Sequence, residues 1–208
     1  MKIEIWSDVV CPWCYIGKRR LESALREFEH ADEVEIAWRS FQLNPDAPDR
    51  AVPTRDYLAR RFGPQAEAMT ARVADLARAE GLELNFDRAL TVNTLDAHRG
   101  IHLATERNVA SAAEERLMHA HFTEGADLSA PETLASLLGE VGLDPDDVRG
   151  VLAGTEYADA VRADVEEAYA LGATGVPFFV IDRTYGIPGA QPAEVFLGVL
   201  RKAYAGRD

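Results

Sequence analysis

The chain has 208 residues, 47% of them hydrophobic and 27% charged, which suits a globular protein with one domain, or one domain carrying a large insertion. Its 22 Lys and Arg residues against 35 Asp and Glu residues give a formal net charge of −13, which argues against nucleic acid as a partner. Twelve of the acids lie between residues 124 and 167 with two arginines. A solvated helical face explains this run better than an acidic docking site.

The chain contains no stretch that predicts insertion into a membrane. Its longest uncharged run covers residues 168–181, and Gly172, Gly175 and Pro177 interrupt it, so it is too short and too broken to span a bilayer. Near the N-terminus, Glu4 and Asp8 stand where a signal peptide has its apolar core. We therefore expect a cytoplasmic protein with no membrane partner.

The N-terminal segment predicts a strand, a helix and a second strand. Ile3 and Ile5 alternate with polar residues over 2–6, which indicates a strand. Apolar residues spaced three and four apart predict a helix over 13–28, and β-branched and aromatic residues predict a strand over 34–43. Strands joined in this way pair in parallel through a right-handed crossover.

The character of the sequence changes after Pro45. A polar, proline-punctuated connector over 46–53 leads into a block with helix signals and almost no strand signals. Within that block, Met69, Val73 and Leu76 form one helical stripe, and Gly81 stands where a C-terminal cap belongs. Short polar residues mark three predicted helix starts: Ser111 with Glu114, Ser129 with Glu132, and Asp144 before Pro145.

The last third of the sequence returns to mixed structure. It predicts a helix from Thr155 to about Leu171, a strand over 176–181, a short antiparallel strand over 185–187 and a helix from Pro192. The expected fold class is therefore α/β, with residues 1–50 and 155–208 forming one domain. Residues 51–154 form an all-helical insertion domain within it.

Chemistry is predicted at the only two cysteines, Cys11 and Cys14. Two cysteines are too few for a disulfide-stapled scaffold or a structural zinc site. The pair lies where the first predicted strand meets the following helix, and a helix N-terminus stabilises a thiolate, lowering the pKa from about 8.5 toward roughly 3.5–7.5. A redox-active pair is therefore favoured over a metal site or a chance pair, and no metal is expected.

The two thiols receive different roles from their positions. Cys11, at the tip of the helix, is expected to attack a substrate disulfide, and Cys14, one turn inside, to resolve the mixed disulfide. Pro12 suits the first helical position because its missing N–H would be unpaired there. Trp13, between the cysteines, is expected to be exposed and to contact substrate. Trp6 and Trp38 are expected in the core.

The combination of motifs resembles the DsbA family of thioredoxin-like proteins, and more closely its FrnE-like cytoplasmic branch. The likeness extends over nearly the whole chain. It is carried by residues 11–17 (CPWCYIG), 41–45 (FQLNP), 174–179 (TGVPFF) and 188–191 (PGAQ). The resemblance implies a thioredoxin-like fold interrupted by the helical insertion.

The resemblance also implies a role for Pro177. In thioredoxin-like folds, a cis-proline before a central strand faces the cysteine pair, so we expect a cis Val176–Pro177 bond close to Cys11. The Val176 backbone would then be free to pair with an extended substrate, and Val176 and Pro177 join Pro12 and Trp13 as substrate-binding residues.

The expected function is a dithiol–disulfide oxidoreductase acting on protein or small-molecule thiols and disulfides, as a monomer or homodimer. No cofactor is obligatory, and glutathione is a candidate redox partner. Two alternatives remain open. The resemblance includes 2-hydroxychromene-2-carboxylate isomerases and kappa-class glutathione transferases, which typically have serine at the position of Cys11. The second alternative is a peptide-binding or chaperone-like module that has no catalytic turnover.

Three further polar residues attract attention but favour structural roles. His98 and His102 share a helical face as paired metal ligands do, yet no third ligand is placed by the sequence to complete a site. Asn93 is where a glutathione-type pocket might be sought, but asparagine before a helix is usually a cap.

Overall fold

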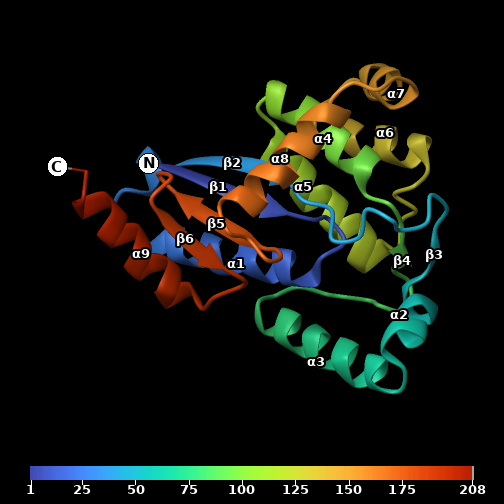
Figure 1. Cartoon of the computed structure of the whole chain (residues 1–208), viewed down its shortest axis with the longest axis horizontal. Helices are drawn as coiled ribbons and strands as arrows, with labels where there is room; N and C mark the ends of the chain where they lie inside the picture. The colour runs from blue at the N-terminus through green and yellow to red at the C-terminus, as the bar shows by residue number, and fades with distance from the viewer. Residues whose placement is uncertain (208) are drawn as a thin grey trace.

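A computed structural model describes residues 1–207, and its elements follow the predicted order. The first strand, helix and strand are β1 (Lys2–Ser7), α1 (Pro12–Glu27) and β2 (Glu35–Ser40), with a short 3-10 turn, Ala31–Glu33, before β2. The C-terminal elements are α8 (Ala158–Ala170), β5 (Phe178–Ile181), β6 (Tyr185–Pro188) and α9 (Ala193–Ala205). The predicted thioredoxin-like α/β fold with a helical insertion is confirmed (Figure 1).

The sheet has four strands in the order β2-β1-β5-β6. The predicted parallel pairing is present, with Ile5 of β1 opposite Trp38 of β2, while β5 runs antiparallel to both β1 and β6. Because β1 is central, it joins the N-terminal unit to strands more than 170 residues later in the chain, such as Ile3 to Ile181.

The two faces of the sheet are covered by different helices. Side chains alternate along a strand, so Ile3 and Ile5 point to one face and pack with α1 and with Phe196 of α9. Trp6 lies on the opposite face, where its indole nitrogen donates to the Asp164 carbonyl of α8 at 2.7 Å. Both Trp6 and Trp38 are buried, as predicted.

The inserted block is helical apart from one small two-stranded sheet. Its helices are α2 (Thr54–Phe62), α3 (Gln65–Ala79), α4 (Leu95–Glu106), α5 (Ala110–His119), α6 (Pro131–Gly139) and α7 (Pro145–Ala153). The sheet pairs β3 (Val52–Pro53) with β4 (Leu90–Thr91). A π-helical turn, Ala120–Glu124, follows α5. In Figure 1, α4 to α7 lie together at upper right, and the α2–α3 pair lies apart from them at lower right.

Two of the predicted capping boxes are wrong. Ser111 lies inside α5 and does not cap it. Its hydroxyl accepts from the buried Trp38 indole at 2.8 Å. Ser129 precedes α6 by two residues, and its hydroxyl bonds Asp127 at 2.5 Å. Helix α6 instead begins with Pro131 at its first position.

The predicted start of one helix at Thr155 is too early, and the predicted cap of another, Asp144, is confirmed. Helix α8 begins at Ala158, three residues after Thr155, and its cap residue Tyr157 has φ 63°. At α7, the Asp144 side chain accepts from the Asp146 N–H at 2.9 Å, as predicted.

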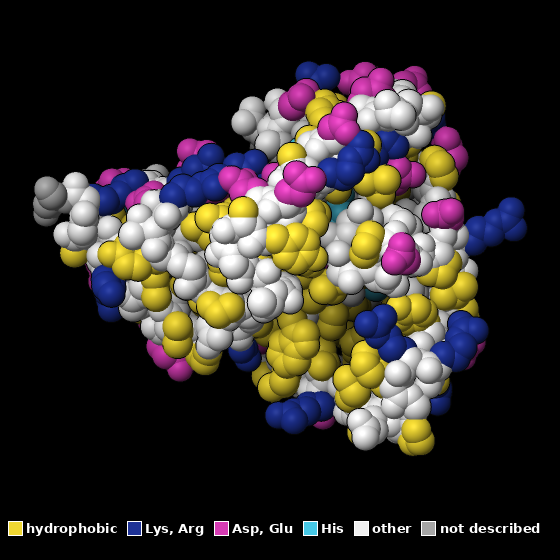
Figure 2. Space-filling model, viewed as in Figure 1, with side chains coloured by type: hydrophobic (Ala, Val, Ile, Leu, Met, Phe, Trp, Pro, Cys, Tyr) yellow, Lys and Arg dark blue, Asp and Glu magenta, His cyan; other side chains and the backbone are white. Residues whose placement is uncertain are grey.

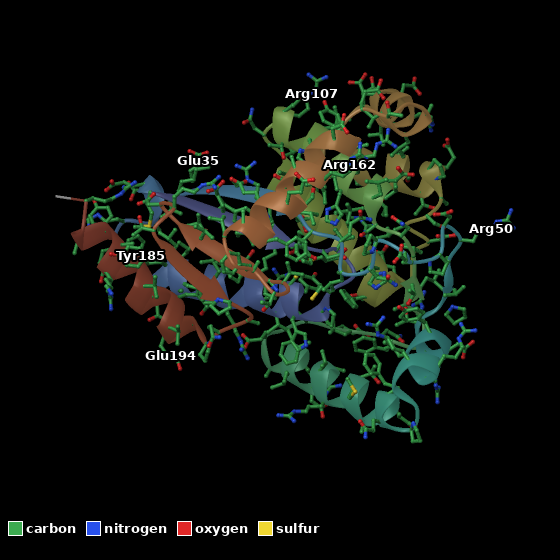
Figure 3. All side chains as sticks on the ribbon, viewed as in Figure 1. Glu35, Arg50, Arg107, Arg162, Tyr185 and Glu194 are labelled. Carbon is green, nitrogen blue, oxygen red and sulfur yellow. The ribbon has the colours of Figure 1, made fainter. Side chains whose placement is uncertain are left out.

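Charged side chains such as Glu35, Arg50 and Arg107 project away from the body of the molecule (Figure 3). Within residues 1–207, no helix has the length and apolar character needed to cross a membrane.

Candidate active site

The cysteine pair lies where β1 passes into α1. Cys11 is the residue immediately before the helix, and Pro12 occupies its first position, as predicted. The Cys14 N–H donates to the Cys11 carbonyl at 3.1 Å. Both cysteines are free thiols, with Cys11 3% and Cys14 2% exposed, whereas Trp13 between them is 40% exposed. The tip of the helix therefore presents an accessible indole beside a nearly covered sulfur.

The loop before β5 closes over Cys11. The Val176–Pro177 bond is cis, which confirms the expectation from the resemblance. The Cys11 thiol donates to the Val176 carbonyl oxygen at 3.7 Å. Helix α1 passes so close to this loop that a Cβ added at Gly17 would lie 3.0 Å from Cγ of Pro177. The structure thus brings Cys11, Val176 and Pro177 together from opposite ends of the chain.

The half-buried Val176 leaves its main chain open to a ligand. Its carbonyl accepts only from the Cys11 thiol, and its N–H has no hydrogen-bond partner among residues 1–207. An extended segment placed beside Val176 therefore has one main-chain donor available to it.

Cys14 has the opposite electrostatic character to an activated thiol. Burial raises its pKa well above the ordinary value, and the neighbouring Cys11 raises it further. The Asp8 backbone and the Ser7 side chain act in the other direction and lower the Cys14 pKa. Cys14 is therefore a protonated thiol at neutral pH, and its attack on another sulfur requires that the proton leave first.

A group of buried titratable side chains lies behind the cysteine loop. Asp8 accepts from the Leu43 N–H at 2.8 Å, and its other oxygen lies 3.5 Å from Nε2 of His98. This pairing raises the His98 pKa despite burial. His98, Glu114 and His121 keep ring nitrogens or carboxylate oxygens without a hydrogen-bond partner among residues 1–207.

Burial is the largest influence on the pKa values of two members of this group, Glu114 and His121. It raises the pKa of the Glu114 carboxyl to about 7, opposed by the positive charge of His98. It lowers the pKa of His121 to about 4. At pH 7 the Glu114 carboxyl is therefore about half protonated, and the His121 ring is neutral.

Sequence reasoning missed this cluster. The sequence predicts Glu114 in a capping box, but it shares a helical stripe with the buried Leu117 and Met118, three and four residues later. That spacing is a signal for an inward-facing carboxyl. His98 was expected to be a satisfied or solvated helix residue; it is fully buried.

Ion pairs fasten the cysteine helix to the insertion. Glu115 of α5 accepts from the Tyr15 hydroxyl at 2.7 Å and from Lys18 at 2.6 Å, and it pairs with Arg19. These donors lower the pKa of the Glu115 carboxyl to about 2, against the effect of its partial burial. The network fixes α1 in place relative to α5.

The other polar candidates have structural partners. His102 contacts Ser40 and Asp164, both at 3.2 Å, and no group of three or more metal-ligating side chains occurs within residues 1–207. Asn93 accepts from the Leu95 N–H at 2.9 Å, as a residue before a helix does, and from Gln42 at 2.9 Å.

An apolar pocket of about 430 Å³ opens beside Cys11. One wall is formed by the cysteine loop and Val176, and the facing wall by α2 and α3 of the insertion. Figure 2 shows it as a hollow surrounded by yellow side chains above α3, with basic groups along its edge. Its lining includes Cys11, Pro12, Trp13 and Val176, four of the six predicted site residues.

Comparison with known proteins gives one family for the chain. The family model described as a DSBA-like thioredoxin domain matches residues 2–201. The protein YwbO of Bacillus subtilis (strain 168) is 32% identical over 197 residues, covering 93% of this chain and 92% of that protein.

Solved structures agree with this family. The probable DsbA oxidoreductase SCO1869 from Streptomyces coelicolor is 44% identical with a TM-score of 0.95, covering 100% of this chain and 92% of that one. The cytosolic disulfide reductase DsbM from Pseudomonas aeruginosa, solved with GSH, shares the fold at 17% identity and a TM-score of 0.69, over 99% of this chain and 100% of that one. The chain therefore belongs to the family of DSBA-like thioredoxin domains, which confirms the enzyme class predicted for it, a thiol–disulfide oxidoreductase.

Proposed function

We propose that the chain exchanges disulfides through its CPWC motif, with Cys11 as the nucleophile and Cys14 as the resolving thiol. The Cys11 thiolate attacks one sulfur of a substrate disulfide, whose S–S bond breaks as a new Cys11–substrate disulfide forms and one substrate thiolate leaves. Cys14 then loses its proton and attacks the Cys11 sulfur. This releases the second substrate thiolate, and two electrons have passed from the protein to the substrate. The reverse sequence oxidises a substrate dithiol.

One observation carries this assignment. Cys11 stands at the N-terminus of α1 and lines an open pocket, whereas Cys14 lies one turn inside with a raised pKa. Both sulfurs are nearly covered, but only Cys11 lies at the helix N-terminus, where the helix dipole favours an anion, and only Cys11 lines the pocket. The asymmetry suits a first attack by Cys11 and a second by Cys14.

Substrate binding is proposed to involve Pro12, Trp13, Val176 and Pro177. The unpartnered Val176 N–H supports main-chain pairing with an extended segment, and the exposed Trp13 supports contact with its side chains. Glutathione is proposed as a redox partner without an obligatory cofactor, supported by the likeness in fold to DsbM, whose structure contains GSH. A cytoplasmic location has the same support.

We also propose the division into a thioredoxin-like domain, residues 1–50 with 155–208, and an insertion domain, residues 51–154. It has support from the sheet, all four of whose strands come from the two outer segments.

Substitution of Cys14 by serine tests the roles of the two thiols. Cys14→Ser cannot resolve a mixed disulfide, so it should accumulate a covalent adduct at Cys11 when mixed with glutathione disulfide, as measured by intact mass. Cys11→Ser, its matched control, should form almost none at neutral pH, because Cys14 is protonated and, unlike Cys11, does not line the pocket. Equal adduct formation in both variants would contradict the assignment.

The same pair of variants separates the alternatives. A glutathione-dependent isomerase or transferase that uses Cys11 alone should keep its activity in Cys14→Ser, and a chaperone-like module should keep its affinity for unfolded chains in both variants. An oxidoreductase loses turnover in both.

A further inference from the structure

The pocket beside Cys11 gathers exposed apolar side chains next to the reactive sulfur. Seven large hydrophobic side chains are exposed among residues 1–207, and four of them line this one pocket: Trp13, Leu43, Phe62 and Met69. Exposed apolar side chains gathered in one place indicate a binding surface, whereas scattered ones need no explanation. The volume of about 430 Å³ lies within the roughly 300–1,000 Å³ range of small-molecule sites.

One unpaired cation stands at the edge of this pocket. Arg61 of α2 lines it, lies over the Phe62 ring at 5.7 Å and donates to the Tyr57 hydroxyl at 3.2 Å. No carboxylate lies within 4.0 Å of its guanidinium among residues 1–207. The other charged group in the lining, Asp8, is buried and satisfied by Leu43 and His98.

We propose that this pocket binds small disulfides and thiols with an apolar, aromatic body and a carboxylate, which Arg61 recognises while Cys11 exchanges with the sulfur. The proposal rests on the disulfide exchange at Cys11 and names its substrate class. The apolar walls bind the body of the ligand, and the unpaired guanidinium accepts its anionic end. In a molecule with a net charge of −13, an anionic ligand is otherwise repelled, so a local cation at the mouth decides which anions enter.

The chemistry in the pocket needs no further reactant for one turnover. The Cys11 thiolate attacks one ligand sulfur, the ligand S–S bond breaks, and one aromatic thiolate leaves. Cys14 then loses its proton to solvent and attacks Cys11, the second aromatic thiolate leaves, and the protein keeps the Cys11–Cys14 disulfide. The two protein thiols are the reductant, and two thiols form from each ligand.

Three disulfides test the selectivity. Bis(nitrobenzoate) disulfide is aromatic and anionic, dipyridyl disulfide is aromatic and uncharged, and glutathione disulfide is peptidic and polar. Single-turnover rates of the reduced protein are divided by the rates of dithiothreitol with the same compounds, which removes intrinsic reactivity. We expect the ratio for bis(nitrobenzoate) disulfide to exceed that for glutathione disulfide by about tenfold or more.

Two neighbouring arginines provide matched variants. Arg61→Gln should lower the rate with bis(nitrobenzoate) disulfide about fivefold and leave dipyridyl disulfide nearly unchanged. Arg60→Gln removes the same charge from the next position of α2, outside the pocket lining, and should leave both rates unchanged. Equal effects of the two substitutions would mean that net charge, and not recognition by Arg61, sets the rate, and would overturn the proposal.

A binding measurement separates failure of the proposal from failure of the redox assignment. Cys11→Ser cannot exchange disulfides, but it should still bind nitrobenzoate, detected as quenching of tryptophan fluorescence that weakens in Cys11→Ser/Arg61→Gln. Binding without exchange in the wild type would reject the redox function alone. Exchange without this binding would reject the pocket. If a disulfide-linked peptide with apolar flanking residues reacts more than tenfold faster than bis(nitrobenzoate) disulfide, the pocket holds protein side chains and the proposal is wrong.

Discussion

Glu114 is 1% exposed, and burial raises the pKa of its carboxyl to about 7. His98 and Lys18 favour its charged form, and Asp8 disfavours it. Because the folded-state pKa is raised, folding favours the protonated acid. Stability is then fully present below about pH 4.5 and declines as pH rises toward 7, beyond which the loss levels off.

Replacing Glu114 with glutamine should remove this pH dependence. The shift from 4.5 to about 7 corresponds to roughly 3 kcal/mol, most of which falls between pH 5 and pH 8.5. The free energy of unfolding of the wild type should therefore fall by roughly 2–3 kcal/mol more than that of Glu114→Gln over that interval. Urea unfolding at both pH values, with reductant present, measures the difference. A pH-independent gap between the two proteins would show that Glu114 is ionised throughout.

At the residue scale, the sequence predicts the reactive pair and its exposed indole but not the charges around it. Cys11, Pro12 and Trp13 are adjacent, so their arrangement depends only on where the helix begins. Glu114 and His98 reach the back of the cysteine loop through the packing of α4 and α5, which no local pattern encodes. The capping prediction at Ser111 fails for the same reason, because its hydrogen-bond partner Trp38 lies 73 residues away in the sequence.

At the scale of elements, the close approach of α1 to the cis-proline loop depends on Gly17. A side chain there would meet Cγ of Pro177 at 3.0 Å and the Phe179 ring at 3.2 Å. Glycine is a poor helix former, so its presence in the middle of α1 is explained by the space it leaves for that loop.

Alanine at two helical glycines tests this reading. Gly198 lies in α9 with nothing near the position of an added Cβ, so Gly198→Ala should raise the free energy of unfolding by about 0.5–1 kcal/mol. Gly17→Ala should instead lower it by about 1 kcal/mol, because overpacking against Pro177 outweighs the gain in helix propensity. It should also slow disulfide exchange. If Gly17→Ala is more stable than the wild type and its rate of disulfide exchange is unchanged, the loop that contains Pro177 moves aside without cost, which would contradict this reading.

Element boundaries follow from the sequence where local chemistry decides them. Asp144 caps α7 before Pro145, and Gly81, with φ 77°, follows the end of α3. The stripe that begins with Met69 and Val73 predicts α3 correctly, yet these two side chains line the pocket beside Cys11. Periodicity identifies the apolar face of a helix but not whether protein or ligand covers it.

At the scale of the whole molecule, the active site is assembled from three distant parts of the chain. The first strand and helix provide the cysteines, the loop before β5 provides Val176 and Pro177, and α2 and α3 provide the facing wall. The resemblance predicts that the first two meet. The position of the facing wall depends on how α2 and α3 pack beside the cysteine loop, which no sequence motif predicts. Only the structure therefore places Arg61 in the same pocket as Cys11.

The account depends most directly on the ability of Cys11 and Cys14 to form a reversible disulfide with each other. Equilibration in glutathione buffers of graded redox ratio, followed by acid quenching, alkylation of free thiols and intact mass, measures the populations of the two forms. We predict a single two-electron transition between the reduced protein, in which both cysteines are alkylated, and the disulfide form, in which neither is. Little protein with one alkylated cysteine should be present at any ratio. Persistence of both free thiols at every ratio, or a stable adduct of glutathione on Cys11 with Cys14 still reduced, would contradict the central claim.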